Sequence, residues 1–243
     1  LMGLSQQQIG GINESIAEAR ESADASMGTV GEVFAAINEI IDERMSTPDD
    51  GDDMLRQLTR GEKDGRKLTR DELYNICSTM FVAGFDTTAG MLAIALGYFA
   101  KDEETRHHLA THPDLIAAAI EEVVRLHAFV QSSRTAQVDS KFGDVYIKAG
   151  DQVLLPTVMA NRDPEEFENP NEFDMYRSPN RHYGFGLGPH RCVGSHPARL
   201  ELRAALEEWF KRIPEFAHPE GYITPYQNGH VINIQEQKIQ WQA

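Results

Sequence analysis

The sequence predicts a mainly α-helical protein with small β sheets. Apolar residues recur at helical spacing in several long segments, and one mostly apolar run extends from a capping sequence at 69–72 to about Ala100. The strand-like segments, at 134–137, 145–147 and 152–155, are short. With 243 residues, of which 41% are hydrophobic, and no evident linker, we expect one domain spanning residues 1–243.

Composition excludes several classes of function. The net charge of -15 argues against nucleic-acid partners, which need a basic face, and against docking on anionic lipid. Two distant cysteines do not form a disulfide scaffold. No stretch of ~20 uninterrupted apolar residues predicts a membrane span, and no signal peptide is evident. We therefore expect a cytoplasmic protein. Because the first residue is Leu1, the sequence is expected to begin at a cut, a gap or a fragment boundary.

In the N-terminal part, residues 11–25 and 30–41 each predict a helix. In the second, the apolar positions with helical spacing are Val30, Val33, Phe34, Ile37, Ile40 and Ile41. The acidic segment 47–53 indicates an exposed loop, and 60–67 a turn or hairpin.

A long helix should start at the capping sequence, where Thr69 caps the first turn and Glu72 reaches back. Extending to about Ala100, it would be ~45 Å long at ~1.5 Å per residue, and such an apolar helix is normally buried. Its middle, 83–88, carries glycine, aspartate and two threonines, which are poor choices for the centre of a buried helix.

The C-terminal part alternates helices with short strands. Pro113 opens a helix that ends near His127. Residues 148–151 predict a turn between two strands, and 161–179 an irregular segment. The last helix should span 193–212 and stop before Pro214, with short strands around the turn at 228–229.

The most specific segment is Phe185-Gly-Leu-Gly-Pro-His-Arg-Cys-Val-Gly194. Its glycines permit a tight turn and close approach to something flat. Cys192 then stands at the start of a helix, where negative charge is favoured and backbone N–H groups can reach a metal-bound sulfur. The alternative is a glycine-rich turn with an unremarkable cysteine.

Two further motifs are weaker on their own. Glu122 and Arg125 share a helix face, which by itself indicates only a local ion pair. Asp86 and Thr87 place an acid and a hydroxyl inside the apolar helix, where a threonine can bend the helix and Gly84 eases the distortion. A buried polar cluster that makes a helix contact is the alternative.

The cysteine segment resembles the haem-binding loop of cytochromes P450, Phe-Gly-x-Gly-x-His/Arg-x-Cys-x-Gly, strongest over about 71–216. The resemblance implies a P450 fold and haem b, with Cys192 as the axial ligand to iron. The resemblance assigns the haem propionates to His190 and Arg134. The residues that it places around the macrocycle are Phe185, Gly186, Gly194, Ala83 and Gly84.

The same resemblance assigns the other motifs. Glu122 and Arg125 would lock the haem-side core, with Arg177 as third member. Thr87 would stabilise bound oxygen, and Asp86 would help to relay protons. Residues matched to the substrate pocket, for which ordinary core packing is an equal alternative, are Val82, Val130, Ser132 and Val231.

The implied reaction is monooxygenation of a small apolar substrate with O2. Electrons would come from a ferredoxin-type donor and its NAD(P)H-dependent reductase, because the sequence holds no flavin or iron–sulfur motif. The basic residues Arg191, Arg199 and Arg203 are candidates for the docking face, with a solvated helix face as the simpler reading.

Three alternatives stay open: a peroxide-driven peroxygenase, a non-catalytic haem protein and an inactive relic. A peroxygenase of this family usually lacks the acid–threonine pair. By the motif positions, the chain would be a C-terminal portion without the family's first two-fifths. Catalysis by these residues alone is therefore in doubt, and we expect the isolated chain to need the rest of the protein.

Overall fold

The computed structural model describes residues 6, 26–47, 51–227, 231–234 and 236–241. The chain divides into two compact units, Leu1–Phe85 and Asp86–Ala243, and helix α4 contributes to both. The expectation of a single domain stays a prediction. The helix expected at 11–25 and the turn at 228–229 lie outside the described residues.

The first unit contains α2 (Ser26–Ser46), α3 (Met54–Arg60) and the hairpin of β1 (Glu62–Lys63) and β2 (Arg66–Lys67). Its buried apolar residues are Ile37, Ile40, Ile41, Leu55, Leu73 and Cys77. Helix α3 was not predicted. It begins after Asp53, whose carboxylate accepts a hydrogen bond of 3.0 Å from the Arg56 N–H.

Helix α4 (Arg70–Lys101) is continuous and begins with the predicted capping box. The Glu72 N–H donates to Thr69 Oγ1 at 3.2 Å, and the Thr69 N–H donates to Glu72 Oε2 at 2.9 Å. The C-terminal half is buried, with Phe99 fully enclosed. The middle is exposed instead: Val82 is 57% exposed, and nothing lies within 4 Å of the place a Cβ on Gly84 would occupy.

By length and composition alone, α4 is apolar enough to cross a membrane, with a mean hydropathy of 1.5 over 18 residues. Polar residues at 86–88 interrupt it, so a search for an uninterrupted apolar stretch does not find it. The core helix of a soluble protein meets the same criteria. A single helix of this kind is weak evidence for a membrane span.

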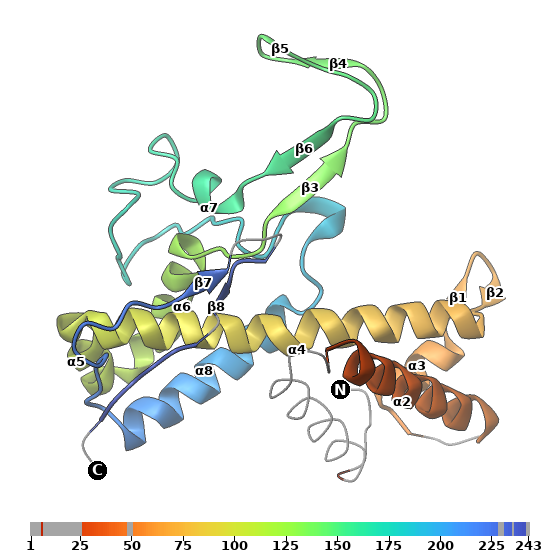
Figure 1. The fold of residues 1–243 in the computed structure, drawn as a ribbon, viewed down its shortest axis with the longest axis horizontal. Helices are drawn as coiled ribbons and strands as arrows, with labels where there is room; N and C mark the ends of the chain where they lie inside the picture. Colours follow the sequence, from red (N-terminus) through yellow and green to blue (C-terminus); the bar gives the residue numbers. More distant parts are fainter. Residues whose placement is uncertain (1–5, 7–25, 48–50, 228–230, 235, 242–243) are drawn as a thin grey trace. The chain divides into compact units, whose positions relative to one another are not determined.

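The second unit packs the C-terminal half of α4 with α5 (Glu103–Thr111), α6 (Ile116–Leu126) and α8 (Ser195–Arg212), as Figure 1 shows. A 3₁₀ turn, η1 (Pro113–Leu115), leads into α6, so Pro113 does open this helical segment. The shared core includes Phe99, Leu109, Val123, Leu206 and Phe210.

The strands of the second unit form two-stranded antiparallel ladders. Strand β3 (Ser132–Thr135), two residues earlier than predicted, pairs with β6 (Gln152–Leu155); β4 (Ser140–Phe142) pairs with β5 (Val145–Ile147), and β7 (Tyr226–Gln227) with β8 (Asn233–Ile234). In Figure 1 the β4–β5 hairpin extends outward beyond the β3–β6 ladder. The expected turn at 148–151 forms, closed by the Asp151 N–H on the Lys148 carbonyl at 3.1 Å.

Candidate functional site

Cys192 lies in a compact loop between the 3₁₀ turn η2 (Gly188–His190) and α8. Its N–H donates to the Phe185 carbonyl at 2.8 Å, which closes the loop on itself. Gly186 makes this possible because its φ of +67° lies in the left-handed region, which side chains disfavour. Gly194 is the N-cap of α8, and a Cβ there would stand 3.8 Å from Cys192 Sγ. The loop thus presents one sulfur at the start of a helix.

The chemistry of this loop fits a haem iron ligand. Cys192 is exposed and is not in a disulfide, so its sulfur is available from the loop surface. A soft thiolate at a helix N-terminus, beside free backbone N–H groups, is a suitable axial ligand. His190 and Arg134 are exposed as well. Arg134 Nη1 donates to the Ser133 carbonyl at 2.7 Å, which leaves other guanidinium donors for a propionate.

The Phe185 ring takes part in the core packing of the second unit rather than standing free. It is half-buried, and the Arg199 guanidinium lies over its face at 4.3 Å from the ring centroid. The cysteine loop is therefore attached to α8 through an aromatic side chain as well as through the backbone.

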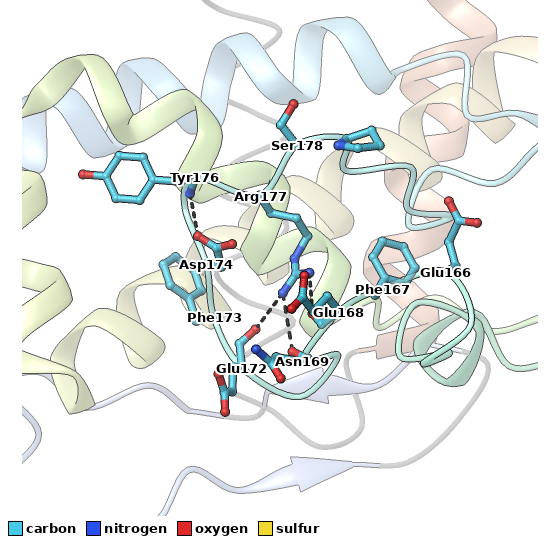
Figure 2. Close-up of a pocket in the computed structure, with 11 residues that line it drawn as sticks. Glu166, Phe167, Glu168, Asn169, Glu172, Phe173, Asp174, Tyr176, Arg177 and Ser178 are labelled. Carbon is cyan, nitrogen blue, oxygen red and sulfur yellow. Dashed lines mark hydrogen bonds between the residues drawn. The ribbon is translucent and has the colours of Figure 1, made fainter.

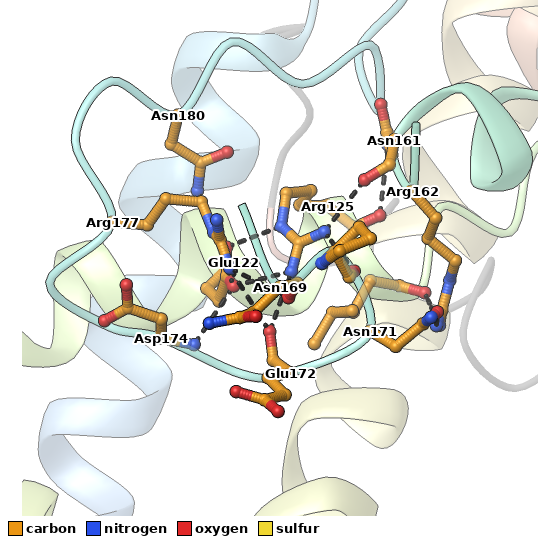
Figure 3. Close-up of polar contacts among 12 residues, drawn as sticks. Glu122, Arg125, Asn161, Arg162, Asn169, Asn171, Glu172, Asp174, Arg177 and Asn180 are labelled. Atoms are coloured by element: carbon orange, nitrogen blue, oxygen red, sulfur yellow. Dashed lines mark hydrogen bonds and ion pairs between the residues drawn. The ribbon is translucent and has the colours of Figure 1, made fainter. Parts of the chain in front are cut away.

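Glu122 and Arg125 form a fully buried ion pair on α6, shown in Figure 3. Arg125 donates from Nε to Glu122 Oε2 at 2.8 Å and from Nη2 to Oε1 at 2.7 Å. Arg177 Nε also donates to Glu122 Oε1, at 3.0 Å, so the three side chains meet as the resemblance implies. Burial alone would raise the pKa of Glu122, but the hydrogen bonds from Arg125 and Arg177 outweigh it and lower that pKa.

The remaining donors of Arg125 hold the irregular segment. Nη1 donates to the carbonyls of Asn161 and Pro170 at 2.8 and 2.7 Å, and Nη2 to the Glu172 carbonyl at 2.9 Å. Asn161 is fully buried, and its Oδ1 accepts the Tyr183 N–H at 2.7 Å. Arg125 thus holds the backbone of 161–172 in place, and Asn161 connects this region to Tyr183, in the segment that precedes the cysteine loop.

A cavity of about 690 Å³ opens beside this irregular segment (Figure 2). Arg177 reaches into it and donates to the Glu168 carbonyl at 2.7 Å. Its lining contains none of the residues expected to bind haem or substrate; Arg177 was expected only as a structural partner of Glu122. Its walls are mostly polar, formed by carboxylates and backbone of residues 166–179. It is therefore not the pocket that the sequence predicts.

The other predicted residues lie on α4 and near β3. Val82, Ala83 and Gly84 lie on α4 in the first unit with exposed surfaces, whereas Asp86 (exposed) and Thr87 (half-buried) belong to the second unit. Val130 and Val231, 101 residues apart in the chain (231 − 130), form an antiparallel β-bridge. Ser132 begins β3 and is half-buried. The structure thus joins two of the four predicted substrate residues.

Sequence reasoning missed a cluster beside the cysteine loop. Glu121, next to Glu122 on α6, accepts two hydrogen bonds from Arg199 and one contact from His182. Arg199 had been considered a solvent-facing cation for a partner, but its guanidinium is held by Glu121. Arg203 pairs with Glu207 one turn further along α8 and is exposed. The only indication of this cluster in the sequence is Glu121 itself, a second glutamate next to the buried face of α6.

Comparison with known proteins gives consistent matches over nearly the whole chain. The family model described as cytochrome P450 matches residues 14–242. A probable cytochrome P450 127A1 from Sinorhizobium fredii is 35% identical over 99% of the chain, and the biotin biosynthesis cytochrome P450 of Bacillus subtilis is 38% identical over 75%. The crystal structure of CYP101J2 covers 100% of the chain with a TM-score of 0.86 and 33% identity.

The chain covers only part of each of these proteins. It spans 58% of the Sinorhizobium protein and 46% of the Bacillus protein, so about half the length of the curated relatives it matches, and 60% of the solved chain. The helix-rich architecture with small sheets agrees with the fold of the matched structures.

Proposed function

This chain belongs to the cytochrome P450 family, and we propose that the whole protein is a haem-thiolate monooxygenase that acts on a small apolar substrate. The observation that carries the proposal is the position of Cys192: an exposed sulfur at the N-terminal end of α8, in a loop closed by Gly186. A helix N-terminus stabilises the negative charge of a metal-bound thiolate.

Within this proposal Cys192 binds the iron of haem b, and His190 and Arg134 bind the propionates. The guanidinium of Arg134 suits a carboxylate because its donors form a planar fork. Phe185, Gly186 and Gly194 of the cysteine loop would contact the macrocycle, as would Ala83 and Gly84 of α4. When bound, the haem with its thiolate ligand supplies the oxidising chemistry, which the thiolate promotes by donating electron density.

Two residues of α4 would stabilise bound oxygen and relay protons. The hydroxyl of Thr87 offers a hydrogen-bond donor, and the exposed carboxylate of Asp86 can exchange a proton with solvent at its Oδ atoms. This pair favours use of O2 over use of peroxide, and it distinguishes the proposal from a passive haem carrier. Replacing Thr87 with alanine should therefore reduce turnover that depends on electron donors more than turnover driven by H2O2.

Substrate, partner and location complete the proposal. The substrate contacts are assigned to Val82, Val130, Ser132 and Val231, of which the β-bridge joins Val130 and Val231. A ferredoxin-type protein and its NAD(P)H-dependent reductase supply the electrons, and the enzyme works in the cytoplasm. The Bacillus and Sinorhizobium relatives support a bacterial P450 of this kind.

The test is the difference spectrum of the reduced protein with CO. We expect the long-wavelength Soret band of a thiolate-ligated haem in the wild type and its loss in Cys192→Ala. Cys77→Ala is the matched control, because Cys77 is buried in the core of the first unit and is not part of the loop, so the substitution should leave the band unchanged. A thiolate band that survives in Cys192→Ala would refute the assignment.

A further inference from the structure

Three side chains from distant parts of the chain meet beside the cysteine loop. Glu121 lies on α6, Arg199 on α8, and His182 in the segment that precedes the loop. Arg199 Nε and Nη2 donate to the two carboxylate oxygens of Glu121 at 2.6 and 2.8 Å. His182 Nε2 lies 3.0 Å from Glu121 Oε2. We call these three residues the Glu121 cluster.

The hydrogen bonds fix where the charges of the cluster lie. The Gly184 N–H donates to His182 Nδ1 at 3.1 Å, so Nδ1 carries no proton and the proton of Nε2 is donated to Glu121. Glu121 and Arg199 carry opposite charges and form the ion pair of the cluster. Burial alone would raise the pKa of Glu121, but the hydrogen bonds from Arg199 and His182 hold it at about 2.

Arg199 is the member of the cluster that contacts the cysteine loop. Its guanidinium stacks on Phe185, whose carbonyl accepts the Cys192 N–H. Arg199 Nη1 also donates to the Ser195 carbonyl, in the first turn of α8, at 3.3 Å. The hydrogen bond to Glu121 raises the pKa of Arg199, and the negative charge of Glu121 adds to that effect. The positive charge is thus held between Glu121 and the loop that carries Cys192.

We propose that Glu121 and Arg199 are positioning residues that fix a positive charge beside Cys192 and thereby set the reduction potential of the iron bound there. This inference rests on the proposed haem-thiolate function. Reduction adds one negative charge to the haem, and a nearby positive charge stabilises that state in a partly buried, weakly screened site. Arg199 and Glu121 are each about 30% exposed, at 30% and 29%, so the charges are only partly screened.

A purely structural role would have a different signature. The cluster also ties α6 to α8, and breaking it from either side would destabilise the loop in the same way. An electrostatic role requires opposite effects, because removing Arg199 deletes the positive end and removing Glu121 deletes the negative end. The sign of the change in potential therefore separates the two accounts.

The experiment measures the midpoint potential of the haem-loaded protein in four variants. We expect Arg199→Gln to lower the potential and Glu121→Gln to raise it. Each change should alter the reduced-to-oxidised ratio up to about tenfold, or about 59 mV for a one-electron couple. Arg199→Lys keeps the charge and should remain near the wild type. Arg212→Gln is the control, because Arg212 is exposed at the end of α8 and pairs with Glu208 on the same helix.

Each outcome of this experiment either supports or overturns the inference. Shifts of the same sign, no shift in either variant, or loss of haem from both would overturn the inference. If only Arg199→Gln fails to bind haem, an upward shift in Glu121→Gln supports the inference and an unchanged potential overturns it. A wild type with a thiolate-type CO spectrum but no opposite shifts leaves the proposed function intact. A wild type without that spectrum removes the proposed function and this inference together.

Discussion

Arg125 shows how much of the structure one side chain can organise. It is fully buried, forms two hydrogen bonds with Glu122 and donates three more to backbone carbonyls of 161–172. The Phe167 ring lies 5.1 Å from its guanidinium carbon and closes the site from solvent. All five N–H donors are used, so the charge is compensated although it is buried.

Truncating Arg125 should therefore be severely destabilising. Arg125→Ala leaves the Glu122 carboxylate buried without its main partner and removes five hydrogen bonds, which predicts a loss of about 3–5 kcal/mol in the free energy of unfolding. Urea denaturation followed by circular dichroism would measure it. Arg203→Ala is the control: the Arg203–Glu207 pair is exposed, so about 0–1 kcal/mol is expected. Equal losses in the two variants would show that burial of the pair is not the cause.

At the scale of the element, the stability of α4 depends on its N-terminal capping box. The capping box satisfies two backbone N–H groups that the first turn would otherwise leave unpaired. Thr69→Ala should cost about 1 kcal/mol in the free energy of unfolding, and Thr69→Ser should restore most of it. Thr79→Ala, on an exposed face of the same helix, is the control and should be neutral or slightly stabilising. A loss in Thr79→Ala as large as in Thr69→Ala would contradict the capping account.

Elements with a strong apolar period or a capping signal could be predicted from the sequence. The capping box, the proline before α6, the strand at Val145–Ile147 and the end of α8 at Arg212 agree with the structure. Helix α5 could not be predicted from periodicity because its segment, EETRHHLAT, has little apolar pattern. It depends on Asp102, whose carboxylate caps it, and on Leu109, which is buried in the tertiary core.

In the candidate site, too, some residues could be predicted from the sequence and others could not. The loop around Cys192 carries its own signature, because Gly186 and Gly188 both adopt the positive φ that favours glycine. Arg177, which joins the Glu122–Arg125 pair, could be predicted only through a known family, and the Glu121–Arg199 pair not at all. Those two residues are 78 positions apart, and nothing local distinguishes Arg199 from the exposed arginines of α8. Only the packing of α6 against α8 brings them together.

For the whole molecule, pH acts through two opposing effects. The net charge of -15 produces self-repulsion at neutral pH, which weakens as acidic groups take up protons. His127, at the end of α6, acts in the other direction. Burial, then the positive charges of Arg162 and Arg125, lower its pKa from 6.5 to about 4. Its own contribution can be isolated only by comparing the wild type with a variant that cannot titrate there.

The comparison of His127→Gln with the wild type should reveal a defined pH window. Because the folded pKa lies below the unfolded value, the unfolded chain takes up the proton first as pH falls. The stability that His127 contributes is thus present above about pH 6.5, declines below it and is lost by about pH 4, with a total of up to about 3 kcal/mol. Urea midpoints of both proteins, measured at several pH values from 7.5 to about 4.5, test this. The wild type should lose its advantage over the variant across that range, and above pH 7 the difference should be constant. A difference between the two that does not vary with pH would show that His127 titrates normally in the folded protein.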